Sequence, residues 1–376
     1  MKKMIIYAVF AVIFASLFSL NVSAQDDSIY KNQYNSSGAE ELYDNLTDDA
    51  KDLIDDLGIS PESYDWQKTL TSENVFELIA DLIKNGAREP FGACGVMIIM
   101  MVVASVVNGV FFEKNNQISG VMTYITLICV TLSVIIPFVK SIKAVIAAIK
   151  GCSNFVLGFL PVYTGVLASM GKPATAAASS SVMLVVCQVV TQLAGNFILP
   201  IISIYLALNI ANVSGGMLKT VKLSETLKSV AIWGLSFLMT VFLGVMSIQT
   251  TISAAADSAG MRTAKFVVSS TVPIVGVAVS EAISTVGGCL KLLSTTTGMF
   301  AVLSVVIIFL PVLCQLLIWK LSVFLLCSFA QLLDEKDIES VTAAINSTIS
   351  MIIGIILCIG IMFIVSLTII ISVGGR

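Results

Sequence analysis

Long apolar stretches alternate with short polar ones over most of the chain. Beyond Pro90 the apolar stretches cover residues 91 to 112, 118 to 139, 150 to 170, 179 to 208, 229 to 253, 266 to 290, 299 to 330 and 347 to 373. A backbone in lipid must satisfy its own hydrogen bonds, so stretches of this length predict α-helices and not barrel strands. We therefore predict an all-α polytopic membrane protein, with seven or eight transmembrane segments in a multi-pass domain at 91–376.

The N-terminus has the pattern of a cleavable secretory signal. Two lysines precede an apolar run from Met4 to Leu20, and small residues follow up to Ala24. We predict a signal peptide over residues 1–24, with an uncleaved anchor as the alternative. Either interpretation places residue 25 onward outside the cytoplasm.

Residues 25–90 form an acidic segment, which we predict to be extracytoplasmic. It holds 16 Asp and Glu against 5 Lys and Arg. Leu42, Leu46, Leu53 and Leu57 fall near helical spacing, with Gly58 as the expected C-terminal stop. A second short helix is expected from about Asn74 to Asn85, ended by Gly86. Their apolar stripes pack against the membrane domain or another protein, unless the segment is a solvated acidic spacer.

The distribution of basic residues bears on how the membrane domain is oriented in the membrane. Residues 91–376 hold 14 basic against 8 acidic side chains, and six lysines lie at 140 to 150 and 219 to 228. The positive-inside tendency favours these lysines in the cytoplasm. Seven crossings would allow this if 91–139 contains a re-entrant or interfacial piece, whereas eight crossings would place the lysines outside.

Two parts of the chain resemble each other at one offset. Pro161 and Gly165 correspond to Pro273 and Gly276, and ILPIIS at 198–203 corresponds to FLPVLC at 309–314. The landmarks predict repeat units at about 150–253 and 265–373, with chance similarity among apolar segments as the alternative. Copies of three crossings each would be inverted, an arrangement that commonly places broken helices at a shared site.

Candidate packing or conduit residues follow from this pattern. Proline and glycine interrupt a span only where protein or water covers the backbone, so Pro161, Gly165, Pro273 and Gly276 are expected at close contacts. Glu281 lies within an apolar segment, where a carboxylate faces a cavity or a partner. Glu281 therefore either has a functional role or forms a structural hydrogen bond.

Composition argues against an enzyme. The chain has no histidine, which removes the usual general base and the commonest zinc ligand. The eight cysteines lie in or beside apolar segments without a CxxC pair and are expected as small core residues. The basic residues form no stripe interleaved with aromatics, so nucleic-acid binding is not expected. We assign no catalytic, cofactor-binding or metal-binding residue.

Several stretches resemble stage III sporulation protein AE. They are LYDNLTDDAKDLIDDLGISPESYDW in the acidic segment, FLPVYTGVLASMGKPATAA, and DSAGMRTAKFVVSSTVPIVGVAVSEAISTVGG. The most specific part is RTAKF, which comprises Arg262, Thr263, Ala264, Lys265 and Phe266, with VPIVG after it.

The resemblance implies a subunit of a channel or secretion-like complex in the mother-cell membrane around the forespore. The implied partners are the other stage III A-operon membrane proteins and, across the intermembrane space, the stage II protein Q. An assembly or conduit role is therefore expected. The alternative is a secondary transporter that binds a small solute with broken helices and Glu281.

Overall fold

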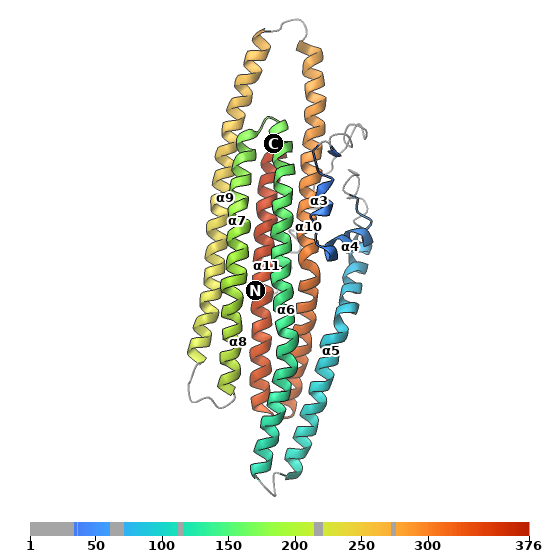
Figure 1. The fold of residues 1–376 in the computed structure, drawn as a ribbon, viewed down its shortest axis with the longest axis vertical. Helices are drawn as coiled ribbons and strands as arrows, with labels where there is room; N and C mark the ends of the chain where they lie inside the picture. Colours follow the sequence, from blue (N-terminus) through green and yellow to red (C-terminus); the bar gives the residue numbers. More distant parts are fainter. Residues whose placement is uncertain are drawn as a thin grey trace.

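The computed structural model describes residues 34–35, 37–60, 71–111, 116–213, 221–271 and 276–375, and these contain helices and turns but no strand. Seven helices build an elongated bundle (Figure 1). Their bounds are α5 Ser72–Phe111, α6 Asn116–Ser169, α7 Pro173–Leu193, α8 Leu199–Val213, α9 Val221–Thr271, α10 Gly276–Leu332 and α11 Lys336–Gly375. The predicted all-α membrane class is confirmed.

Six of the described segments are long and apolar enough to cross a membrane, against the seven or eight expected. They are Glu73–Val103, Ile128–Ser169, Pro173–Ala211, Lys222–Ala259, Leu293–Leu332 and Lys336–Ser372. One cause of the difference is α6, which unites two predicted segments. Lysine has good helix propensity, so the expected linker from Lys140 to Lys150 continues the helix with its three lysine side chains exposed.

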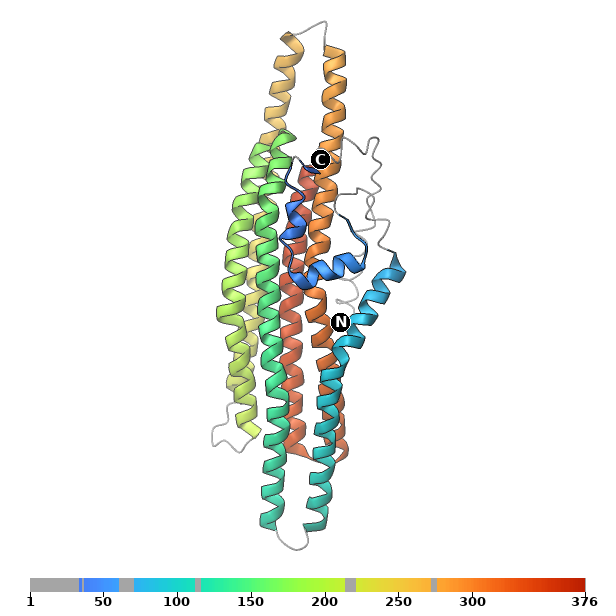
Figure 2. The ribbon, with the colours of Figure 1, turned by 45° about the vertical axis from the view of Figure 1, so that its right-hand side comes forward.

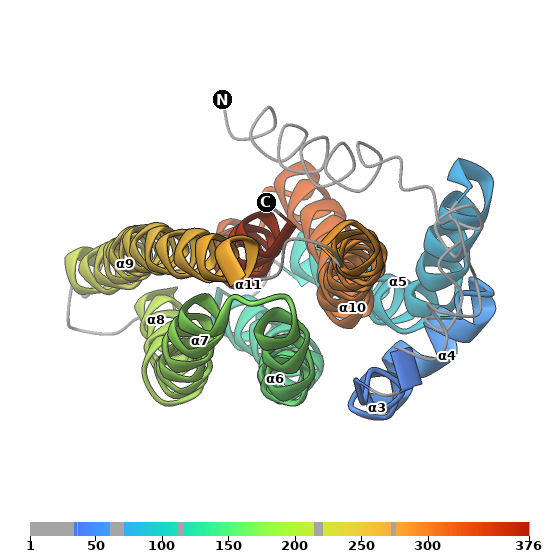
Figure 3. The same cartoon turned by 90° about the horizontal axis from the view of Figure 1, so that it is seen from above.

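The axis of the bundle is filled by α11. Seen from above, α11 lies between α9 and α10, with α6 and α7 across one side (Figure 3). Its buried apolar side chains include Ile338, Val341, Ile345, Ile349, Ile352, Ile356, Ile359, Phe363, Leu367 and Ile370. Gly298 of α10 lets Ile371 approach so closely that a Cβ on this glycine would overlap it. The centre of the chain is therefore packed apolar side chains.

Residues 37–60, which we call the arm, contain α3 (Glu41–Asp44) and α4 (Asp48–Asp56). The arm lies across α6 and α10 (Figure 2). All four leucines of the predicted stripe are buried, so the arm packs on the bundle and is no solvated spacer. Tyr43 donates a 2.7 Å hydrogen bond to Asp55, and this bond raises the pKa of Tyr43 to about 12. It joins the two short helices.

The predicted stop of α4 is confirmed at Gly58. Its φ is 64°, its N–H bonds to the carbonyl of Asp55, and the N–H of Ile59 bonds to the carbonyl of Ile54. These two bonds form a Schellman motif, which needs a residue that adopts the left-handed conformation at low cost.

The predicted stop at Gly86 is wrong. Helix α5 continues through Gly86 and through Pro90, so the domain boundary predicted at residue 90 falls inside it. Gly86 fits against α10 instead, since a Cβ there would lie 3.2 Å from Cδ1 of Ile318. Packing on a neighbouring helix, and not a turn, accounts for this glycine. This packing also supports α5 at the turn where Pro90 lacks a backbone N–H.

A π-helical turn, Ala194–Ile198, joins α7 to α8 directly before Pro200. Proline cannot donate to the residue four positions earlier and its ring crowds that carbonyl, here Asn196. The wider turn removes this conflict, so α7 and α8 continue as one helical run.

Candidate functional site

The stretch around Pro161 forms a helical hairpin and not a broken helix. Helix α6 continues through Pro161 and Gly165 to Ser169, and the chain turns at Gly171, whose φ is 76°, before Pro173 opens α7. The predicted break at Pro161 is therefore wrong, because a single missing N–H does not end a helix whose neighbours remain packed. The turn instead combines a left-handed glycine with proline at the first helical position.

Pro161 and Gly165 both lie on an exposed face of α6. A Cβ on Gly165 would have no atom within 4 Å. The close contact expected of this glycine is therefore not made within the described part of this chain. Any such contact would come from residues outside the described part or from another molecule.

The other predicted site residues are only partly described. Pro273 and the side chains of Glu281 and of the RTAKF motif, residues 262–266, lie outside the described residues. The backbone of that motif belongs to α9, and Gly276 begins α10. Their roles, and the pairing of Gly276 with Gly165, stay predictions.

The two predicted repeat units do not run in opposite directions. The run α7–α8 and helix α10 descend in Figure 1, whereas α9 and α11 both ascend. Pro200 follows a π-helical turn, but Pro311 lies within uninterrupted α10. If the units are copies, they are parallel and not inverted.

A first charged layer lies where α7 begins. Asp257 of α9 is buried, and its two carboxylate oxygens accept hydrogen bonds from the backbone N–H of Ala174 (2.9 Å) and Thr175 (2.7 Å). Burial lowers the pKa of Lys172, Lys291 of α10 lowers it further, and Asp257 opposes both effects. Charged groups from the α6–α7 turn, α9 and α10 thus meet at this end, which we call the upper layer.

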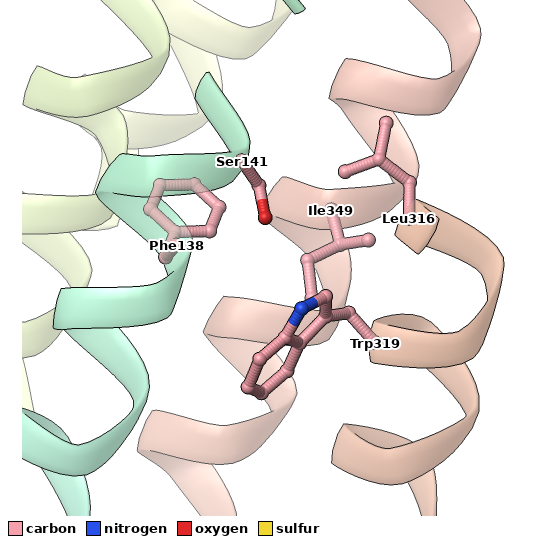
Figure 4. Close-up of a pocket in the computed structure, with 5 residues that line it drawn as sticks. All are labelled: Phe138, Ser141, Leu316, Trp319 and Ile349. Atoms are coloured by element: carbon pink, nitrogen blue, oxygen red, sulfur yellow. The ribbon is translucent and has the colours of Figure 1, made fainter. Parts of the chain in front are cut away.

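A second charged layer crosses the bundle further along. Lys228 of α9 donates a 3.0 Å hydrogen bond to Ser347 Oγ of α11, and Tyr205 of α8 donates to the same oxygen at 3.2 Å. Two residues on, Ile349 closes a small cavity of about 10 Å³ with Phe138, Ser141, Leu316 and Trp319 (Figure 4).

This cavity joins α6, α10 and α11 at one level of the bundle. Lys140 lies two residues after Phe138 and pairs with Glu89 of α5 at 3.3 Å, and Lys320 directly follows Trp319. Lys140, Lys228 and Lys320 therefore share a level, which we call the lower layer. Beyond it the apolar α5–α6 hairpin extends past the ends of α8 and α9 (Figures 1 and 2).

The separation of the two layers matches a bilayer. Between Lys228 and Asp257, α9 has 28 residues without a charge, and α10 has 28 between Lys291 and Lys320. At 1.5 Å per residue each stretch is about 42 Å long. A bilayer with its headgroup regions is roughly 40–45 Å thick. On α9 and α10 the stretch between the layers therefore has the length and the apolar composition of a membrane-spanning segment.

The arm docks at a level between the two layers, over two glycines of α6. A Cβ on Gly151 would lie 2.5 Å from Cγ2 of Thr47, and one on Gly158 would lie 2.6 Å from Nδ2 of Asn45. The glycines are seven residues apart, so they lie on nearly the same face of α6. Sequence reasoning missed this seam, although the spacing of Gly151, Gly158 and Gly165 was a visible signal.

Comparison with known proteins agrees with the motifs. Residues 62–374 match the sequence profile of the family described as Stage III sporulation protein AE. A protein of that name from Bacillus subtilis (strain 168) is 28% identical over 325 residues, which cover 85% of this chain and 78% of the relative. No solved structure matches the chain.

Proposed function

The chain belongs to the stage III sporulation protein AE family and acts in sporulation, and from this premise we propose that it is a membrane subunit of a mother-cell-to-forespore channel complex. Its partners in this proposal are the other stage III A-operon membrane proteins and, across the intermembrane space, the stage II protein Q. In this proposal the acidic segment 25–90 is in contact with extracytoplasmic water, and the membrane domain lies in the mother-cell membrane around the forespore.

One observation carries the proposal: α11 fills the axis of the bundle. A row of its large apolar side chains from Ile338 to Ile370 is buried against the surrounding helices. A passage for solutes therefore has to run between chains, which suits a subunit that works by assembly. The exposed Pro161 and Gly165 face of α6 fits such an assembly, because small residues let a second helix approach closely.

The test is reconstitution of the purified chain in vesicles, alone and together with its proposed partners. Release of entrapped carboxyfluorescein is followed, with vesicles that hold the partners without this chain as the control. We expect release only from the complete set, and co-purification of the chain with at least one stage III A-operon protein. Uptake or release of small solutes by the chain alone would instead support the secondary transporter.

A further inference from the structure

At the level where the arm docks, the two sides of the bundle differ in chemistry. The hydrogen bond from Ser153 Oγ to the carbonyl of Cys187 sets the level of α6 beside α7. Cys187 lies between Ala178, which contacts Gln249 of α9, and Tyr205, which lies at the level of Lys228. The docking site of the arm is therefore level with the middle of α9, between Lys228 and Gln249.

On that stretch α9 exposes a continuous apolar side, which we call the lipid face. It consists of Val230, Trp233, Phe237, Val241, Val245, Ile248 and Ile252. Trp233 is 68% exposed, Phe237 is 57% exposed, and their rings stack at 5.4 Å. An open groove of about 430 Å³, lined mainly by valines of α7 and apolar side chains of α9, continues this side. The lipid face extends from one charged layer to the other, and this length suits contact with acyl chains.

The opposite side, which we call the water face, is formed by the arm and the first part of α5, residues 72–89. Figures 1 and 3 show these elements across the bundle from α9. Over the described residues 37–60 and 71–90 there are twelve carboxylates and three basic side chains. All twelve carboxylates are exposed, including the eight of the arm.

The charged part of α5 also lies between the two layers. Glu89 pairs with Lys140 and Gly86 packs against Ile318, so residues 86–89 are at the lower layer. The preceding turns of α5, with Glu73, Glu77 and Asp81, rise from there toward the arm. Acidic side chains thus occupy one side of the bundle at the depth where α9 is apolar.

We propose that several copies of this chain surround an aqueous passage in the membrane, with the lipid face of α9 outward and the water face inward. A carboxylate exposed to acyl chains is strongly unfavourable, whereas an apolar helix face is favourable there. Lipid on one side and water on the other, at the same depth, is the environment of a channel wall. This inference rests on the proposed function, and it adds which face lines the passage.

Spin labels at two depth-matched positions test the proposal. Phe237→Cys on α9 and Asn154→Cys on α6 are introduced separately into a full-length chain whose eight native cysteines are replaced. Asn154 is exposed beside the glycine seam. Each labelled chain is reconstituted with its partner proteins in vesicles, after both variants are shown to retain the abundance and spore titre of the parent.

We expect the label at position 154 to collide several-fold more with a water-soluble nickel chelate than the label at 237 does, and the label at 237 to collide several-fold more with oxygen. Equal oxygen exposure at both positions would overturn the proposal, because the arm side would then face lipid. Shielding of position 237 from both reagents would also overturn it, since protein would then cover α9.

Copy number separates this inference from the proposed function. The chain carries one fluorophore, and bleaching steps are counted for single complexes in the same vesicles. We expect several steps per complex. A single step overturns the aqueous passage between copies, yet dye release that needs the partner proteins would still support the channel subunit.

Discussion

Replacing Gly158 by leucine is the sharpest test of how the arm is held. Even a Cβ at this position would lie 2.6 Å from Nδ2 and 2.7 Å from Cγ of Asn45. Alanine can be accommodated if Asn45 rotates away and loses its 3.0 Å hydrogen bond to the Glu41 carbonyl, a loss of about 0.5–1.5 kcal/mol. Because Gly→Ala favours a helix by roughly 0.5–1 kcal/mol, we expect Gly158→Ala to be nearly neutral.

Rotation of Asn45 does not make enough room for a leucine side chain, so the arm has to move. Overpacking of this kind costs about 1–3 kcal/mol, which corresponds to a rise of roughly 5- to 150-fold in the population of undocked arm. The readout is labelling of Leu46→Cys, a buried arm position, in a chain without native cysteines. We expect the labelling rate to rise by that factor in Gly158→Leu.

The matched control is Gly165→Leu, seven residues further along the same helix. No atom lies within 4 Å of the position of its Cβ, so it should leave arm labelling unchanged. Equal labelling rates in the two leucine variants would refute the docking of the arm on this seam. A sporulation defect in Gly165→Leu with a docked arm would instead locate a contact between chains at Gly165.

Three further substitutions test the packing of the bundle by thermal unfolding in detergent. Asp257→Ala should destabilise the chain by about 2–4 kcal/mol, since two backbone N–H groups lose a charged acceptor; unchanged unfolding would show that water replaces it. Tyr163→Phe should cost about 1–3 kcal/mol because it removes the 3.1 Å partner of the buried Ser294 hydroxyl, and adding Ser294→Ala should restore part of the loss; strictly additive effects would contradict this coupling. Gly298→Ala should cost about 1–3 kcal/mol through overlap with Ile371, and Ile371→Ala should relieve it, whereas wild-type unfolding of the single variant would argue against close α10–α11 packing.

Local sequence rules succeeded where the structure is decided locally. The stop at Gly58 was predicted correctly, because the left-handed C-terminal residue depends only on neighbours in sequence. The four leucines of the predicted stripe are buried, but their helical spacing is interrupted, since the chain breaks into α3 and α4 around Leu46. The same rules failed at Gly86 and Pro161. Each lies in a helix that continues because other elements pack against it, and those contacts are not visible in a window of sequence.

The polar contacts that define the upper and lower layers could not be predicted from the sequence. Asp257 caps a helix that begins more than eighty positions earlier, and Lys228 finds its hydroxyl partner Ser347 more than a hundred positions later. Nothing in the spacing of these residues pairs them. The level shared by Lys140, Lys228 and Lys320 likewise emerges only when three helices are aligned by contacts.

Depth also explains why α7 begins with a polar, small-residue run and turns apolar at Val182. Its first turns, with Thr175 buried and Ser179 bonded back to the Thr175 carbonyl at 2.6 Å, lie at the upper charged layer, where Asp257 satisfies the helix start. From Val182 the helix borders the apolar groove shared with α9. Polar composition at the upper layer thus fits the edge of a bilayer, whereas the arm docks further along α6, where Thr47 and Asn45 contact Gly151 and Gly158. In the proposed assembly of several copies, the aqueous passage supplies water to the carboxylates on this side of the bundle, while the lipid face of α9 contacts acyl chains.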